Sequence, residues 1–136
     1  MEPEFPFEFL VFGTPLSQQA SSTSKQEWKQ RIREESAKKL PEMSFCYEGH
    51  VAVTIYHFPQ SVMVGDVDNI VKPILDALGA HLYKDDNQVV RVAVQKFEAG
   101  QPAIFTNPSA ALTEALTGPR PVTYIEISNE PFGEVA

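Results

Sequence analysis

The sequence predicts an α+β fold, in which two main helices pack on a small mixed β-sheet of about four strands. Three observations support this prediction. Four segments alternate apolar and polar residues with the period of two that is typical of a strand. Two segments repeat apolar residues with the 3.6-residue period of a helix. The length of 136 residues suits one domain with a core of its own.

Composition limits the class of protein. The chain is 43% hydrophobic and 21% charged, as in ordinary globular domains. Its single cysteine, Cys46, excludes an internal disulfide and fits a reducing compartment. No apolar run reaches the length of a membrane span, and the acidic, phenylalanine-rich residues 1–9 do not resemble a signal peptide. We therefore expect residues 1–136 to form a single domain of a cytoplasmic protein.

The first strand is predicted over residues 5–12, and Gly13 and Pro15 end it. Its two faces alternate, with Phe7, Phe9 and Val11 on one side and Glu8, Leu10 and Phe12 on the other. The next segment, residues 17–24, is rich in Ser, Gln and Thr and predicts a mobile loop. Such a loop is either plain surface disorder or an arm that grips a substrate.

The first helix is predicted over residues 25–40, and Pro41 ends it. Ser24 is the expected N-cap, and Glu27, three residues later, would complete a capping box. The apolar stripe that should face the core consists of Trp28, Ile32, Ser36 or Ala37, and Leu40.

Basic residues gather on this helix, although the net charge of the whole chain is −7. Six of the 11 lysines and arginines fall between residues 25 and 39, against three glutamates. An acidic chain is an unusual nucleic-acid binder, so a local basic segment matters. Its basic side chains either form a solvated face or contact phosphates, and the candidates for phosphate contact are Lys25, Lys29, Arg31 and Arg33.

A second strand is predicted within residues 45–58, with Val51, Val53 and Ile55 on one face. His50 and His57 flank or extend this strand. Neither has a partner at the close spacing of a metal site, so both are expected to be structural.

Carboxylates and one lysine are concentrated just after this strand. Asp66 and Asp68 are two residues apart and should project from one face of an extended segment. A helix is predicted over residues 69–78, with Asp68 or Asn69 as its N-cap. The spacing of Asp68, Lys72 and Asp76 places them on one face of the helix. The opposite stripe is apolar and Gly79 is the expected C-cap, with the stripe formed by Ile70, Ile74 and Leu78.

A second acidic segment, residues 85–87, reads Asp-Asp-Asn and predicts a turn. If this turn folds back beside Asp66 and Asp68, three or four carboxylates converge, and such a cluster needs a cation. Carboxylate oxygens suit Mg²⁺ or Mn²⁺. The plainer alternative is that one segment only caps a helix and the other only forms a turn.

The rest of the chain predicts two more strands and a short helix. Residues 88–97 form a strand in which Lys96 ends an apolar row, either to extend into solvent or to support a metal site. Residues 109–116 form a short helix that either covers the sheet or makes dimer contacts. Residues 122–128 form the last strand, and the tail after Pro131 is expected to be loose.

The two acidic segments together resemble the RusA-like family of Holliday-junction resolvases. The matching residues are Asp66, Asp68, Asn69, Lys72, Asp76, Ala77, Leu78, Asp85, Asp86, Gln88, Val89, Val90 and Lys96. The resemblance implies a small α+β homodimer that cuts four-way DNA junctions with a divalent metal. It implies that Asp66, Asp68 and Asp86 are the catalytic metal ligands and that Lys72 is the essential basic residue beside them.

The resemblance also implies supporting roles for the remaining acidic and basic residues of the pattern. Asp76 would hold Lys72 or join the outer metal shell, and Lys96 would be a supporting charge. Asp85 is either an outer-shell acceptor or a turn residue. One departure concerns residues 58–64, which carry no basic residue where some resolvases have clustered arginines.

We therefore expect a metal-dependent, structure-selective DNA endonuclease that acts on branched DNA as a homodimer, with Mg²⁺ or Mn²⁺ as cofactor. The alternative is a non-catalytic DNA- or protein-binding module that retains the fold, which the acidic balance favours. A third class is a metal-dependent hydrolase of a small phosphate ester.

Overall fold

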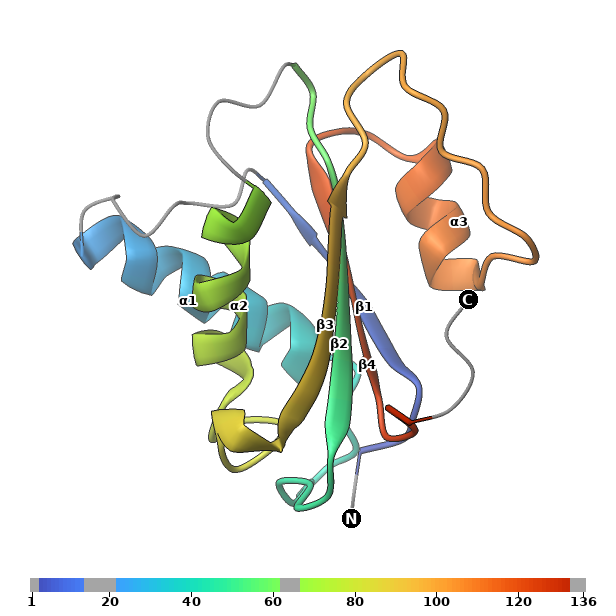
Figure 1. The fold of residues 1–136 in the computed structure, drawn as a ribbon. Coiled ribbons are helices and arrows are strands. Elements are labelled where there is room, and N and C mark those ends of the chain that lie inside the picture. Colours follow the sequence, from blue (N-terminus) through green and yellow to red (C-terminus); the bar gives the residue numbers. More distant parts are fainter. Residues whose placement is uncertain (1–2, 14–21, 62–66, 133–136) are drawn as a thin grey trace.

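The computed structural model describes residues 3–13, 22–61 and 67–132. It contains a four-stranded mixed sheet with helices on both faces (Figure 1). In chain order, the elements are β1 (Phe7–Phe12), α1 (Ser22–Ala37), β2 (Val51–Phe58), the 3₁₀ turn η1 (Val67–Ile70), α2 (Val71–Leu78), the 3₁₀ turn η2 (Asp86–Gln88), β3 (Val89–Lys96), α3 (Ala110–Thr117) and β4 (Val122–Ser128). The α+β prediction is confirmed. Within the described ranges, no helix is both long enough and apolar enough to cross a membrane.

The strand order across the sheet is β1-β4-β2-β3. β4 is antiparallel to both β1 and β2, whereas β2 and β3 are parallel. A parallel pair needs a crossover connection, and α2 lies in that crossover. The topology therefore places the acidic segments at the two ends of one short helix, with η1 before it and η2 after it.

One face of the sheet is covered by α1 and α2. The core on this side joins strand residues such as Phe9 and Ile55 to Ile32 of α1 and Ile74 of α2. The predicted alternation of β1 is confirmed, since its Phe7, Phe9 and Val11 are buried on this face. The predicted helical stripes are also confirmed. Trp28, Ile32 and Ser36 of α1 are buried, as are Ile74 and Leu78 of α2 and Ile70 at the end of η1.

The opposite face is covered by α3, which packs on β4 and β1. A second core lies here, formed by Phe58, Phe97, Leu112, Ala115, Val122 and Tyr124. The short helix predicted over residues 109–116 is confirmed, and Ser109 caps it by accepting a hydrogen bond from Leu112 N at 3.1 Å. The helix covers the sheet, as one of the two predicted roles required, and its role in dimer contacts stays a prediction.

The start of α1 was predicted wrongly. The helix begins at Ser22, so Ser24 lies inside its first turn instead of capping it. Neither proline nor glycine interrupts the preceding residues, and the packing of Trp28 and Ile32 stabilises helix beyond the local cap signal. Of the predicted loop 17–24, residues 17–21 lie outside the described residues and 22–24 are helical.

The start of α2 also differs from the prediction. Asp68 and Asn69 lie within η1, and the N-cap of α2 is Ile70, whose side chain makes no capping bond. The 3₁₀ turn supplies backbone hydrogen bonds where a side-chain cap was expected. Gly79 is the C-cap as predicted, but its φ is −63°, and the positive φ of 62° falls on Ala80.

His50, just before β2, and His57, within it, both have structural surroundings, as expected. His57 is buried, and its Nδ1 lies 2.9 Å from Thr123 Oγ1 on β4. The ring of His50 packs edge-on against Phe132. The predicted loose tail after Pro131 falls largely on residues 133–136, which lie outside the described residues.

Candidate active site

Lys72, in the first turn of α2, is the centre of the polar cluster on that helix. Its Nζ donates to Asp76 Oδ1 at 2.6 Å and lies 3.8 Å from Asp86 Oδ2. The hydrogen bond and the charge of Asp76, with a smaller contribution from Asp86, raise the pKa of Lys72. The side chains of Lys72 and Asp86 remain about half exposed. The ammonium group is therefore held protonated where a ligand can reach it.

Two basic residues of α1 also turn toward α2. Lys29 Nζ lies 3.7 Å from Asp76 Oδ2. Arg33 Nε donates to the carbonyl of Ala77 at 3.0 Å, and its guanidinium also reaches the carbonyl of Asp76 at 3.4 Å. The last carbonyls of a helix lack partners within the helix, so a cation there is favourable. These contacts join α1 to the end of α2.

The four predicted phosphate contacts are thus differently placed. Lys29 and Arg33 bond to α2, and Arg31 donates to the carbonyl of Phe12 and lies over the ring of Trp28 at 5.7 Å. Lys25, the fourth, is half-buried on the first turns of α1. Three of the four therefore use their charge within the protein, which reduces the donors available to DNA. Their contact with DNA stays a prediction.

The turn that carries Asp86 is fixed by its neighbours. Asp85 accepts from Asn87 N at 3.1 Å, and Asp85 N donates to Gln88 Oε1 at 2.9 Å, so the two side chains form a capping box. The Gln88 amide also donates to the carbonyls of Tyr47 and Gly49, each at 2.8 Å. Asp85 thus has the geometry of a turn residue, and buried Gln88 ties the turn to the segment before β2.

A close approach brings Asp86 against the end of α2. A Cβ on Gly79 would lie 3.1 Å from Asp86 Oδ1. Since the φ of Gly79 is accessible to any residue, the glycine serves this approach and not the backbone angle. Tyr83, also nearby, is buried and donates to the carbonyl of Leu75 at 3.2 Å. Burial, then the charges of Asp86 and Asp76, raise the pKa of Tyr83.

Three of these residues were not predicted from the sequence as parts of the site. Gln88 entered only through the family pattern, Gly79 only as a helix cap, and Tyr83 not at all. A signal for Gln88 was present, because a capping box needs a glutamine or glutamate three residues after Asp85. No local pattern pointed to Tyr83.

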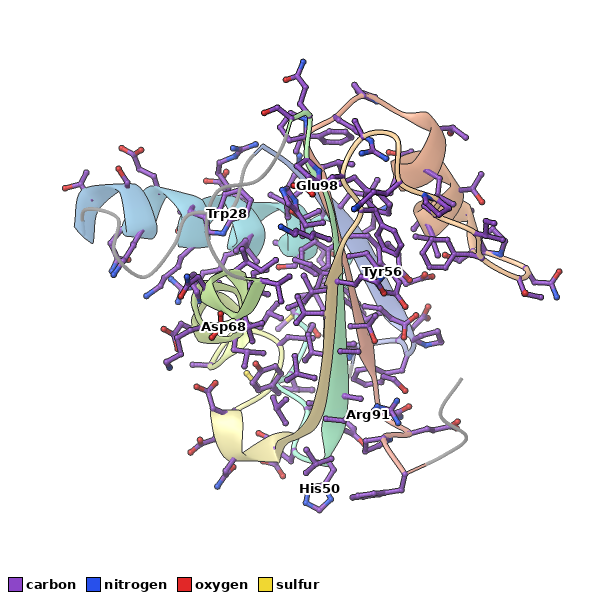
Figure 2. All side chains as sticks on the ribbon, turned by 45° about the horizontal axis from the view of Figure 1, so that its top comes forward. Trp28, His50, Tyr56, Asp68, Arg91 and Glu98 are labelled. Carbon is purple, nitrogen blue, oxygen red and sulfur yellow. The ribbon has the colours of Figure 1, made fainter. Side chains whose placement is uncertain are left out.

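Asp68 lies on η1 directly before α2 and is exposed (Figure 2). Asp66 lies outside the described residues. Lys96, the last residue of β3, lies 3.7 Å from Glu98 and is a full strand away from Asp86, which directly precedes β3. At about 3.3 Å per residue, that strand spans about 26 Å. Lys96 therefore lies far from Asp86, at the end of β3 that pairs with the end of β2, and its supporting role at the metal site stays a prediction.

The donor chemistry of the predicted metal ligands suits a hard divalent cation, because exposed carboxylates such as those of Asp68 and Asp86 are the usual ligands. In the part of the chain that the structure describes, no three acidic, histidine or cysteine side chains come together to hold a metal. What the described residues do bring together is Lys72, Asp76 and Asp86. The convergence of Asp66, Asp68 and Asp86 therefore stays a prediction.

Comparisons with known proteins match the part of the chain that carries this cluster. The family model for the endodeoxyribonuclease RusA matches residues 13–106, a span that includes α1, α2, β3 and every candidate site residue. The uncharacterized protein YqaN of Bacillus subtilis (strain 168) is 51% identical over 39 residues, which are 29% of this chain and 28% of YqaN. The chain thus aligns with little more than a quarter of that relative. Because the family model matches well over half of the sequence, the chain belongs to the endodeoxyribonuclease RusA family.

Proposed function

We propose that this protein is a divalent-metal-dependent endodeoxyribonuclease that cuts phosphodiester bonds in branched DNA such as a Holliday junction. Family membership supports the reaction class. The observation that carries the proposal is the protonated Lys72, held by Asp76 and Asp86 on an exposed face of α2. An ammonium group beside carboxylates combines a phosphate contact with candidate metal ligands in one place.

In this proposal Asp66, Asp68 and Asp86 hold Mg²⁺ or Mn²⁺. When bound, the cation would supply Lewis-acid chemistry, since it polarises a phosphate oxygen and acidifies a coordinated water. Lys72 contacts a non-bridging phosphate oxygen and stabilises the negative charge that grows on it during cleavage. Asp76 orients Lys72 through the 2.6 Å hydrogen bond. Gln88 positions Asp86 by fixing its turn.

Branched DNA suits a two-fold symmetric enzyme. A homodimer would present one site to each of two opposed strands of a junction. Lys25, with further basic residues of α1, would contact the phosphate backbone at the side of the site. Family membership and the basic residues of α1 support these parts of the proposal.

The test is cleavage of a synthetic four-way junction with Mg²⁺ or Mn²⁺. We expect Asp68→Asn and Lys72→Met each to lower the cleavage rate by about 10²–10³-fold, because each removes one charge from the reacting centre. Lys84→Met is the matched control, since Lys84 is also an exposed lysine in an ion pair, in its case with Glu48, and lies outside the proposed site. Circular dichroism would verify that all variants fold.

Two results would contradict the proposal. Equal cleavage by wild type and Asp68→Asn would remove Asp68 from the site. A wild-type protein that binds the junction but does not cut it with either metal would favour the alternative function, a non-catalytic DNA- or protein-binding module.

A specific observation favours that alternative. The chain carries a net charge of −7, and Lys29, Arg31 and Arg33 already have partners within the protein. The salt dependence of junction binding measures how many phosphate contacts remain, because each contact steepens the slope of affinity against salt. A shallow slope without cleavage would identify a module that binds proteins.

A further inference from the structure

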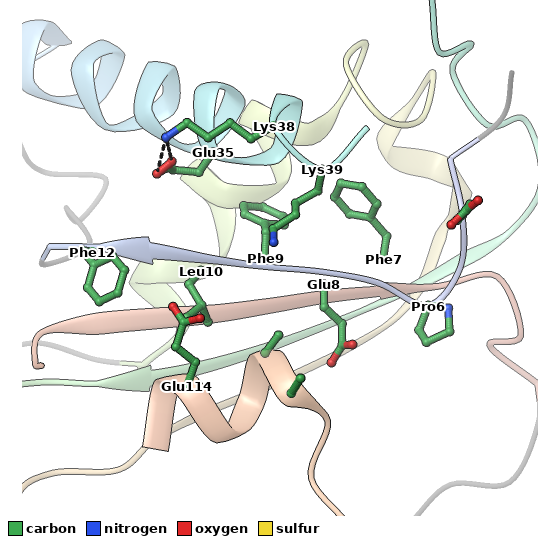
Figure 3. Close-up of a pocket in the computed structure, with 13 residues that line it drawn as sticks. Pro6, Phe7, Glu8, Phe9, Leu10, Phe12, Glu35, Lys38, Lys39 and Glu114 are labelled. Atoms are coloured by element: carbon green, nitrogen blue, oxygen red, sulfur yellow. Dashed lines mark hydrogen bonds and ion pairs between the residues drawn. The ribbon is translucent and has the colours of Figure 1, made fainter. Parts of the chain in front are cut away.

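A trough runs along the free edge of β1. Its volume is about 560 Å³. Its lining includes residues from both faces of β1, such as Phe9 and Leu10, which shows that the strand's edge forms its floor. One wall comes from the end of α1 and the turn after it, and the other from α3 (Figure 3).

The floor presents backbone groups that β4 does not use. Gly13 N donates to Pro121 O, which continues the β1–β4 ladder beyond the Phe12–Val122 pair. Residues of an antiparallel pair alternate between bonding to the neighbour and facing away. The odd-numbered residues therefore bond to β4, and the N–H and C=O groups of Glu8 and Leu10 face the trough. In the described ranges β1 has no other strand neighbour.

Both ends of this free edge are closed. At the amino end, Pro6 has no N–H to offer a new strand. At the carboxyl end, the carbonyl of Phe12 already accepts from Arg31. The open groups between these ends thus define a short window centred on Glu8 and Leu10, and a strand of about five to seven residues would fill it.

The walls decide what kind of strand can enter. Neighbouring strands lie about 4.8 Å apart, so an added strand must fit between the two helical walls. A second copy of this chain would have to bring its own α1 and α3 beside the first pair, because the same helices flank its β1 edge. A single extended segment of another polypeptide has no such obstacle.

The walls also differ in charge. Lys39 reaches from the α1 side toward β1, whereas Glu114 reaches from α3 toward the same strand (Figure 3). Glu35 on the α1 side is neutralised by Lys38 at 2.7 Å. Because successive side chains of a strand point to opposite faces, a complementary segment carries an acidic residue next to a basic one.

We propose that this trough binds an extended peptide segment of a partner protein, which adds to β1 as a fifth strand with an acidic side chain toward Lys39 and a basic one toward Glu114. This is strand addition to an exposed sheet edge. The site is separate from the proposed nuclease site, because Lys72, Asp76 and Asp86 do not line the trough.

The probe is a fluorescent heptapeptide, acetyl-Thr-Val-Thr-Glu-Lys-Val-Thr amide, titrated into the whole chain. We expect saturable binding and, in amide exchange measured by NMR, new protection of the Glu8 and Leu10 amides. A peptide with Glu and Lys two positions apart places both charges on one face and should bind about tenfold more weakly. Methylation of the alternate peptide nitrogens that face β1 should weaken binding at least as much.

Two variants place the binding in the trough. Ala110→Trp fills it from α3 and Lys39→Glu reverses its basic wall, so each should weaken binding about tenfold or more. Ala99→Trp is the matched control for the first, since Ala99 is also exposed but does not line the trough. Lys84→Glu is the matched control for Lys39→Glu, because Lys84 is also exposed but does not line the trough.

Three outcomes would overturn the proposal. The first is no saturable binding at millimolar peptide, and the second is protection that appears on β3 instead of on Glu8 and Leu10. The third is a dimer of the free chain that Ala110→Trp dissociates, since this would assign the edge to a second copy. Junction cleavage is not a readout in any of them, so the result is independent of the proposed nuclease function.

Discussion

The two faces of the sheet carry different kinds of side-chain interaction. The face under α3 gathers aromatic side chains, where Phe97 lies 5.3 Å from Phe58, 5.5 Å from Phe105 and 5.7 Å from Tyr56 between ring centroids. The core under α1 and α2 is mostly aliphatic, although it also contains Phe7, Phe9, Trp28 and Tyr83. The outer surface of α2 carries Lys72 and Asp76 in a solvent-accessible ion pair. Both sides share one sheet, yet one side has a cluster of aromatic contacts and the other has ion pairs on its outer surface.

This difference indicates which interactions stabilise the fold and which side chains are available for chemistry. Buried aromatic pairs add to stability beyond the area that they bury. Exposed ion pairs contribute little, since solvent screens them and their side chains lose freedom. The cluster on α2 therefore adds little to folding, although it is closely held, and its geometry is consistent with the proposed phosphate and metal contacts. The expected effects of three changes, taken from the largest to the smallest, test this division.

The aromatic face should show the largest effect on stability. Phe97→Ala removes a buried ring with three aromatic neighbours and should lower the free energy of unfolding by about 3–5 kcal/mol. Urea denaturation measures the loss. Ile104→Ala is the control in the same segment, because Ile104 is 90% exposed and should change stability by less than about 0.5 kcal/mol. A small loss for Phe97→Ala would contradict the assignment of stability to this face.

The two faces should also respond to pH with opposite sign. Burial, and the nearby Arg120, lower the pKa of His57 on the α1–α2 face to about 4. Between this value and the ordinary 6.5, the unfolded chain binds a proton that the folded chain refuses. The contribution of His57 to the free energy of unfolding is thus fully present above pH 6.5 and falls by up to about 3 kcal/mol as pH approaches 4.

On the α3 face the sign is reversed. Burial first, then the charge of Glu8, raise the pKa of Glu126, whose register partner across β1 and β4 is Glu8. The folded chain therefore binds the proton more tightly, and stability from Glu126 falls as pH rises above its ordinary 4.5. A plot of the free energy of unfolding against pH, from pH 4 to 7, should rise less steeply for His57→Asn than for wild type and more steeply for Glu126→Gln. Parallel curves for wild type and both variants would refute this account.

The α2 face should show the smallest effect on stability and a clear one on activity. Gly79→Ala introduces no backbone strain and reduces the freedom of the unfolded chain, so stability should change by no more than about 1 kcal/mol. The added methyl group displaces Asp86, and junction cleavage should fall about tenfold. Ala80→Gly is the control, since it relieves a positive φ one residue away without reaching Asp86. Unchanged cleavage in Gly79→Ala would show that the close approach has no functional meaning.

Local patterns predicted the elements well where the signal lay within a few residues. The alternation of β1, the stripes of α1 and α2, the capped helix at residues 110–117 and the Lys72–Asp76 pair all depend on spacings of two to four residues. The N-termini of α1 and α2 were misplaced because packing and a 3₁₀ turn overrode weak cap signals. Boundaries depend on such small energy differences, whereas the existence of an element depends on its whole stripe.

The candidate site required more than spacing. Gln88 bonds to carbonyls about 40 residues earlier, Arg33 reaches the end of α2, and Asp86 lies against Gly79. These contacts depend on the parallel pairing of β2 and β3. The crossover through α2 brings the start of β3 beside the start of β2, as in the pair Val51–Val89. No pattern within a window of the sequence contains that information.

The sequence by itself determined the fold class, the family and the acidic and basic residues available for chemistry, because periodicity and residue type are local properties of the chain. Only the tertiary structure decided which charges meet. It placed Lys72 between Asp76 and Asp86, directed Lys29 and Arg33 to α2, and left one edge of β1 open between two helices. The physical reason is that strand order and helix packing set the distances between residues far apart in the chain, and electrostatic and hydrogen-bond energies depend on those distances.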